Sequence, residues 1–140
     1  MVRQAVSNVG LMQTEKDIIY DLNGQPRYRV LEGGRIVDFS GRSVAWIDEQ
    51  RNIYDYHGMH RGWYEDGAWV AHDGGVMAFG ERVEGPCPRL PERRADSPQG
   101  GRPFPEPRRP QVYAPPPKPE RRPAWARRPL GASWSGPSGH

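Results

Sequence analysis

Four glycines recur at a nearly constant interval in the first half of the chain. Gly24, Gly41, Gly58 and Gly74 are 17, 17 and 16 residues apart. The residues around them repeat as well. Five residues before each glycine stand Ile19, Ile36, Ile53 and Trp69. Three residues before stand Asp21, Asp38, Asp55 and, as an exception, Ala71. Because so short a repeat cannot form a core alone, the four copies must bury their apolar sides against one another.

Each repeat has the pattern of a β-hairpin. A β-branched or aromatic run precedes the glycine, a dipeptide such as Asn23-Gly24 or Asp73-Gly74 marks a turn, and a second short apolar run follows. A glycine at the second central position of a type I′ turn supplies the positive φ that the turn needs. The sequence therefore predicts four hairpins with two-residue turns.

Two arrangements of four hairpins remain open, a ladder with free edges or a closed ring. The repeats are too short for propeller blades, which need about 40–45 residues each. A ladder would leave free edges that pair with other chains, whereas closure removes them. We therefore expect an all-β fold in which four short hairpins close around a pseudo-fourfold axis, followed by a disordered tail rich in Pro and Arg.

Strand alternation assigns two faces to these hairpins, provided that the turn has two residues. One face collects the isoleucines and small residues Ile19, Ile36, Ile53, Trp69, Ala45, Ala78, Gly62 and Ile47. The other collects most aromatic rings and four arginines: Tyr20, Phe39, Tyr54, Tyr56, Trp46, Trp63, Phe79, Arg27, Arg29, Arg42 and Arg61. A turn that is longer by one residue would exchange the two faces.

The repeat strings resemble those of a known family. IIYDLNGQPRYRVLEGG, IVDFSGRSVAWIDEQ, IYDYHGMHRGWYEDG and WVAHDGGVMAF are similar to the repeats of the bacterial four-fold beta flower family. The resemblance covers residues 17–81 and implies a module of four hairpins with no established activity. Two positions depart from the pattern: Arg29 stands where later repeats have Trp or Phe, and Ala71 replaces the aspartate.

The second half of the chain has a different composition. Residues 86–140 hold 15 of the 16 prolines and 10 arginines, and their 11 Lys and Arg outnumber 4 Asp and Glu. Such a segment has little apolar surface to bury, which favours disorder with polyproline II character. The predicted organisation is a lead-in at 1–16, a hairpin module at 17–81 and a disordered tail at 82–140.

The aspartates Asp21, Asp38 and Asp55 suggest a metal site, because three carboxylates around one axis could hold a hard cation. The competing interpretation is that each aspartate accepts hydrogen bonds from the amides of its own turn. We favour the second interpretation, since the fourth copy is alanine. No cofactor is expected.

The repeat aromatics are candidate binding residues. Trp46, Trp63 and Tyr56 could line a groove that stacks on sugars, bases or a peptide. In so small a module the same rings are also needed to fill the core, and this is the interpretation that we favour.

No catalytic arrangement is visible in the sequence. His57, His60 and His72 occupy different repeat positions, so the repeat does not bring them together. Cys87 has no evident activating partner. The chain shows neither a phosphate-binding glycine loop nor a nucleophile elbow. We therefore expect a protein that is not an enzyme.

The tail carries a possible ligand for a protein partner. Pro116 and Pro119, followed by Arg121, form the kind of PxxP segment that docks in an aromatic groove, although such matches are frequent in proline-rich tracts. Trp125 and Trp134 could be anchors. The arginine pairs would support only weak, salt-sensitive contact with nucleic acid.

These features lead to a functional hypothesis. The start of the chain lacks a signal-like apolar run, and no stretch approaches a membrane span, so a soluble cytoplasmic location is expected. We expect a non-enzymatic interaction or scaffold module with a flexible basic arm. The alternative is a carbohydrate or cell-wall binding module, because RGWYEDGAWVAHDGG also resembles the repeats of choline-binding solenoids. The sequence does not give the oligomeric state.

Overall fold

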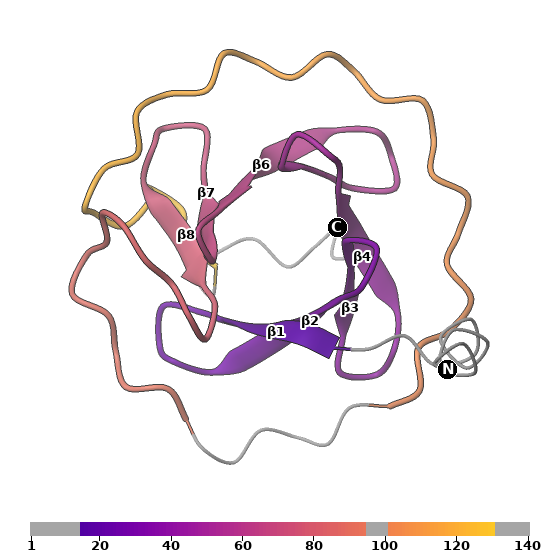
Figure 1. Cartoon of the computed structure of the whole chain (residues 1–140), viewed down its shortest axis with the longest axis horizontal. Coiled ribbons are helices and arrows are strands. Elements are labelled where there is room, and N and C mark those ends of the chain that lie inside the picture. Colours follow the sequence, from indigo (N-terminus) through magenta and orange to yellow (C-terminus); the bar gives the residue numbers. More distant parts are fainter. Residues whose placement is uncertain (1–14, 95–100, 131–140) are drawn as a thin grey trace, which may run out of the picture.

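The computed structural model describes residues 15–94 and 101–130. Eight strands form a closed antiparallel barrel, in which each strand pairs with its neighbours in chain order and β1 also pairs with β8. The strands are β1 (Glu15–Tyr20), β2 (Pro26–Leu31), β3 (Arg35–Asp38), β4 (Ser43–Ile47), β5 (Asn52–Tyr54), β6 (His60–Glu65), β7 (Ala68–Val70) and β8 (Val76–Phe79). Figure 1 shows them around a common axis. The expected all-β fold of four hairpins closed on themselves is confirmed.

The hairpin turns differ from the predicted two-residue type. In the first hairpin the Asp21 amide donates to the Gln25 carbonyl at 2.9 Å, and the Gly24 amide donates to the Asp21 carbonyl at 2.9 Å. This pattern leaves three residues in the loop, and the glycine has a φ of 80°. The other three turns repeat it. Each is therefore a type I turn followed by a glycine in the left-handed region.

A β-bulge in each hairpin compensates for the longer turn. In the first hairpin Tyr20 pairs with Pro26 and Ile19 with Tyr28, so that Arg27 is the extra residue. Val44, Arg61 and Met77 occupy the same place in the other hairpins. One added loop residue and one bulge cancel, so the register beyond the bulge is that of a two-residue turn. The predicted faces are retained for this reason.

The core consists of the face rich in isoleucine. Ile19, Ile36, Ile53 and Trp69, the residues five before each glycine, are completely buried. Trp69 is larger than its three counterparts, and Gly62 on the adjacent strand makes room for it. A Cβ at Gly62 would collide with the Val70 carbonyl and would crowd the indole of Trp69. Large and small residues thus alternate to fill the barrel.

The proline-rich segment encircles this barrel. Residues 82–94 and 101–130, here called the belt, run around the outside of the hairpins, in salmon red to yellow in Figure 1. The belt meets the four turns in chain order. The amides of Arg94, Phe104, Tyr113 and Arg122 donate to the carbonyls of Gly24, Gly41, Gly58 and Gly74, at 3.0, 2.8, 3.2 and 2.8 Å. The four donors are 10, 9 and 9 residues apart, so the belt has a repeat of its own.

The turn glycines also determine how closely the belt approaches. A Cβ at Gly24, Gly41, Gly58 or Gly74 would collide with the carbonyl oxygens of Glu92, Arg102, Gln111 and Glu120 respectively. Each of these carbonyls lies two residues before the amide that binds the same glycine. The glycines therefore serve the turn through their positive φ and the belt through their missing side chain.

In its described residues the proline-rich segment follows a definite path along the barrel. The physical reason lies in the backbone. Proline has no N–H to satisfy and has few conformations to lose, so ordering costs less than for an ordinary chain. The N–H groups that bind the turns come from the non-proline residues between. Side-chain burial stabilises the belt mainly at its end, where Arg121, Ala126 and Leu130 are buried.

Arg29 departs from the repeat because it holds the belt. Its guanidinium donates to the Gly101 carbonyl at 2.8 Å and to the Asp38 carbonyl at 3.1 Å, and it lies over the ring of Phe39. The tryptophans and phenylalanine of the later repeats fill this outer position by packing instead. The exception in the sequence is thus an anchor for the belt.

Nothing in the described ranges forms a helix that could cross a membrane. Most of the predicted lead-in and Trp134 lie outside those ranges. The division of the chain into lead-in, module and tail remains a prediction.

Candidate ligand-binding site

The three repeat aspartates lie on separate turns, and each accepts hydrogen bonds from its own backbone. The Asp21 carboxylate accepts from the amides of Asn23 at 2.8 Å and Gln25 at 3.0 Å. Asp38 and Asp55 repeat this arrangement. Burial raises the pKa of Asp38, but hydrogen bonds from Ser40 and Arg42 outweigh it and hold that pKa below its usual value. Among the residues described, no three His, Cys, Asp or Glu side chains gather as metal ligands would.

The candidate aromatic residues lie beneath the belt. Trp46 and Trp63 are 5% and 4% exposed. Arg109 of the belt covers the ring of Trp46, and Tyr56 donates its hydroxyl proton to Glu106 of the belt at 2.6 Å. Burial and Glu106 raise the pKa of Tyr56. These rings form a packed outer layer, and a flat ligand could reach them only if the belt moved.

The PxxP segment is part of the belt. Pro116 is exposed and Pro119 is half-buried. Arg121 is buried, and its guanidinium donates to the Glu65 carbonyl at 3.2 Å and to Cys87 Sγ at 3.1 Å. Arg121 therefore faces the barrel, and a partner would have to withdraw it before using it.

Two of the three candidate histidines meet, contrary to the sequence argument. His60 Nδ1 lies 2.8 Å from His72 Nε2, and His60 Nε2 lies 2.9 Å from Asn52 Oδ1. β6 and β7 pair Trp63 with Val70, and the same register carried outward places Arg61 opposite His72, so that His60 is the next residue along β6 and lies diagonally from His72. Unlike repeat positions thus become neighbours across adjacent hairpins. His57 lies apart, in the third turn.

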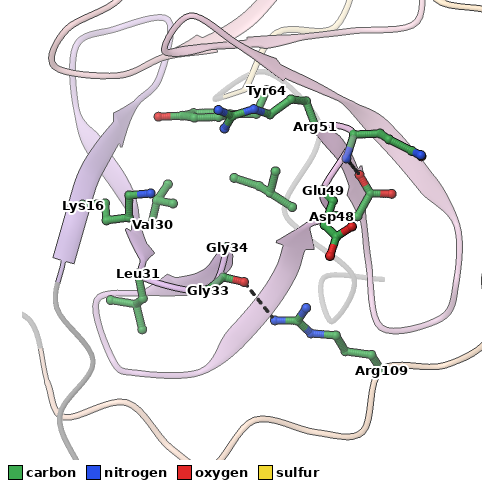
Figure 2. Close-up of a pocket in the computed structure, with 12 residues that line it drawn as sticks. Lys16, Val30, Leu31, Gly33, Gly34, Asp48, Glu49, Arg51, Tyr64 and Arg109 are labelled. Atoms are coloured by element: carbon green, nitrogen blue, oxygen red, sulfur yellow. Dashed lines mark hydrogen bonds between the residues drawn. The ribbon is translucent and has the colours of Figure 1, made fainter. Parts of the chain in front are cut away.

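A cavity of about 720 Å³ lies beside the connections between hairpins. Figure 2 shows its walls. The lining residues are Lys16, Val30, Leu31, Gly33, Gly34, Ile47, Asp48, Glu49, Gln50, Arg51, Tyr64 and Arg109. We call it the connection cavity. Its size lies within the range that holds small ligands.

An apolar wall and a charged rim face each other across this cavity. Val30, Leu31 and Ile47 are buried side chains that continue into the barrel core. Tyr64 is fixed by donating its hydroxyl proton to Asp17 at 2.5 Å. Burial and this carboxylate raise the pKa of Tyr64, so the phenol stays protonated.

Some of the rim charges already have partners. The Asp48 carboxylate accepts from the amides of Gln50 and Asn52, each at 2.9 Å. Arg109 pairs with Glu106 at 2.6 Å. Lys16, Glu49 and Arg51 have no side-chain ion pair with any residue in the described ranges.

Arg51 occupies a position that the other repeats fill with glycine. The carbonyls of Gly34, Arg51 and Gly67 each accept one backbone amide, from Ile47, Tyr64 and Gly80 respectively. Their φ angles are 87°, 71° and 82°. The left-handed region costs a residue with a side chain on the order of 1 kcal/mol. The connection between the second and third hairpins thus places a cation at the cavity, at a backbone position where the connections before and after it have glycine.

Comparison with known proteins identifies the family. A family model described as 4-fold beta flower protein matches residues 17–133. The chain belongs to the four-fold beta flower family. The match includes the belt as well as the hairpins. No curated protein and no solved structure matches this chain. No activity is characterised for the beta flower family.

The connection cavity of this beta flower protein combines apolar side chains with charged ones. What it offers is an apolar wall opposite cationic side chains. Repeat analysis of the sequence missed this site because it aligned like positions, whereas Arg51 is notable for being unlike its counterparts. Its signal was a charged residue at a glycine position.

Proposed function

We propose that this beta flower protein is a non-catalytic binding module whose connection cavity holds a small molecule with an apolar body and a carboxylate or similar anionic group. The strained Arg51 beside the apolar wall carries the proposal. Backbone strain at a charged residue is commonly retained where that residue contacts a ligand. A glycine here would relieve the strain and would remove the cation.

The charges of the rim favour an anion over a cation. The Asp48 carboxylate accepts hydrogen bonds from turn amides, and Arg109 forms an ion pair with Glu106. Among the described residues that line the cavity, this leaves two cations, Lys16 and Arg51, and one carboxylate, Glu49, without such a partner. An anionic ligand would place its charge near these cations and its apolar body against Val30 and Ile47, away from water.

Titration calorimetry on the full chain tests this with hexanoate, hexylamine and hexanol at low salt. We expect hexanoate to bind more tightly than the other two. Arg51→Asn, which keeps a residue tolerant of positive φ, should weaken hexanoate at least threefold. Arg108→Gln, an exposed belt arginine outside the cavity lining, should not. Equal binding of all three probes, or an equal loss in Arg108→Gln, would refute an anionic ligand.

A protein partner is a second candidate, favoured by the distribution of exposed apolar residues. The large hydrophobic side chains exposed in the described ranges are Met59, Phe104, Val112 and Tyr113. Tyr113 binds Gly58 through its amide, which brings Val112 and Tyr113 next to Met59 at the third turn. Exposed apolar groups that lie together are typical of interaction surfaces. Loss of a captured partner on Tyr113→Ala, but not on Arg108→Gln, would support this role.

The carbohydrate and nucleic-acid hypotheses both depend on the belt. Stacking on Trp46 or Trp63 requires the belt to leave, because Arg109 lies over Trp46 and Val83 packs against the cluster that contains Trp63. Several belt arginines are occupied by the barrel: Arg93 lies over Tyr20, and Arg122 donates to the Asp73 carbonyl. Retention on a glycan or choline resin would revive the first hypothesis, and a salt-sensitive mobility shift the second.

A further inference from the structure

A second cavity lies where the end of the belt meets the third and fourth hairpins. Its volume is about 620 Å³, and it shares no lining residue with the connection cavity. It is lined by Arg61, Ala71, His72, Asp73, Met77, Ala126, Arg127 and Arg128. We call it the belt cavity. Three of its residues come from the belt, so the barrel alone would not form it.

The backbone holds the belt arginines of this cavity firmly. Val76 donates to the Ala124 carbonyl at 2.8 Å, and Ala126 donates back to Val76 at 2.9 Å, as in a parallel bridge. Four residues further on, the Leu130 amide donates to Met77 at 2.8 Å, and the Leu130 side chain is completely buried. Arg127 and Arg128 lie between these two attachments. Their positions are therefore preorganised.

Positive charge dominates the belt cavity. Arg61, Arg127 and Arg128 face a single carboxylate, Asp73. Asp73 accepts from the amides of Gly75 at 2.8 Å and Arg127 at 2.9 Å, and Arg122 lies 3.8 Å away. Burial raises the pKa of Asp73, but these amides and arginines lower it further, so the carboxylate stays ionised and occupied.

The two belt guanidinium groups remain available to a ligand. Arg61 pairs with Asp55 at 2.7 Å. For Arg127 and Arg128 the described residues offer no side-chain hydrogen bond or ion pair, and both arginines are exposed. Arg127, Arg128 and His72 line the same cavity, and arginine and histidine are side chains with which proteins hold tetrahedral anions.

The hydrogen-bond chain behind the cavity defines the protonation of His72. Asn52 uses its Nδ2 hydrogens on Asp48, at 3.2 and 3.4 Å, so its Oδ1 must accept from His60 Nε2. His60 Nδ1 then accepts the Nε2 proton of His72. His72 Nδ1 is left unprotonated. It can take up a proton without breaking the chain.

We propose that the belt cavity binds a small tetrahedral dianion, either free phosphate or the phosphate group of a small-molecule monoester, with Arg127 and Arg128 as donors and His72 as a contact that gains a proton. This site is independent of the ligand proposed for the connection cavity. It exists only while the end of the belt is in place.

The charged groups around His72 determine the direction of the pH effect. Arg61 and His60 face it from β6, Asp73 adjoins it on the turn, and Arg127 and Arg128 come from the belt. Burial, followed by Arg61, lowers the pKa of His72 below its usual value. A bound dianion would oppose this effect and favour the protonated ring. Binding should therefore be coupled to proton uptake and should weaken as pH rises.

Calorimetric titration of the full chain with sulfate tests the site, because sulfate keeps its charge throughout this pH range. We expect sulfate to bind at least threefold more tightly at pH 5.5 than at pH 7.5. The double variant Arg127→Gln/Arg128→Gln should lose at least tenfold in affinity at either pH. Arg94→Gln/Arg108→Gln removes the same charge elsewhere on the belt, and this control should lose less than twofold.

Three results would overturn the proposal. These are unchanged affinity in the Arg127→Gln/Arg128→Gln variant, an equal loss in the control variant, or a pH dependence that survives His72→Gln. Hexanoate binding, measured in the same variants, separates this site from the connection cavity and also shows that the fold is intact. Inorganic phosphate and glycerol phosphate distinguish the sources, since a monoester site should prefer the ester.

Discussion

The barrel and the belt are ordered by different forces. In the barrel, completely buried side chains such as Ile36, Ile53 and Trp69 exclude water from a common core. In the belt most side chains are exposed, and order comes from backbone amides that bind the four turns. The comparison shows that a segment with little apolar surface can still be ordered when a folded surface offers it regularly spaced acceptors.

The largest difference should appear when one tryptophan is removed from each region. Trp69→Ala leaves a cavity in the barrel core and should lower the free energy of unfolding by about 3–5 kcal/mol. Trp125→Ala, in the half-buried end of the belt, should cost less than half as much. Urea unfolding followed by circular dichroism measures both. Equal losses would mean that the belt is as much a part of the core as the barrel.

A turn glycine serves both regions, so its substitution should have the next largest effect. Gly58→Ala places a side chain at a φ of 86° and against the Gln111 carbonyl. We expect the free energy of unfolding to fall by about 2–3 kcal/mol, of which about 1–2 kcal/mol is turn strain. Gly33→Ala, at a φ of 89° on a connection that the belt contacts through a 3.4 Å hydrogen bond from the Arg109 guanidinium to the Gly33 carbonyl, should show mainly the strain. Equal losses in the two variants would show that the close approach of the belt to Gly58 adds nothing to the cost of the substitution.

Removal of Arg121 should affect the belt more than the barrel. Arg121→Met deletes the hydrogen bonds to Glu65 and Cys87. We expect the free energy that favours the bound belt over the opened belt to fall by about 1–2 kcal/mol. Hydrogen exchange should accelerate at the Arg122 amide, which binds Gly74, and should change little at core amides of β3. Arg108→Met is the matched control. Uniform acceleration across β3 and the belt would show that the two regions open together.

The smallest expected effect concerns the stiffness of the belt. Pro110→Ala, directly before the contact of Gln111 with Gly58, gives the unbound chain more conformations to lose. We expect the free energy that favours the bound belt over the opened belt to fall by about 0.4–1 kcal/mol, while the free energy of unfolding of the barrel stays unchanged. Hydrogen exchange at the Tyr113 amide measures it. No change there would show that the belt is held by its contacts alone.

The sequence predicted the barrel well because its repeat reflects the core directly. Regular glycines mark the turns, and Ile19, Ile36, Ile53 and Trp69 mark one buried face. The turn length was wrong, since a dipeptide such as Asn23-Gly24 suits either a two-residue or a three-residue loop. The bulges at Arg27 and its counterparts cancelled that error. A bulge leaves no composition signal, so this cancellation was not foreseeable.

The belt and the candidate sites were harder to predict. Pro91, Pro110 and Pro119 each precede a carbonyl that contacts a turn glycine, which is a signal, but it is weak among so many prolines. The contact of His60 with His72 required the register between hairpins, and both cavities require side chains from distant parts of the chain. Propensity and periodicity describe neighbours along the chain and along a repeat. Neither property describes contacts between residues that are distant along the chain and occupy unlike repeat positions.

The order in which the belt meets the turns constrains how the protein can change its size. The belt carries four contact points at intervals of 9 or 10 residues, one for each hairpin. Duplication or deletion of one hairpin would leave these contact points out of step with the turns, unless a matching stretch of belt were gained or lost at the same time. The belt thus restricts the number of hairpins in this protein, because each hairpin needs its own stretch of belt from a distant part of the gene.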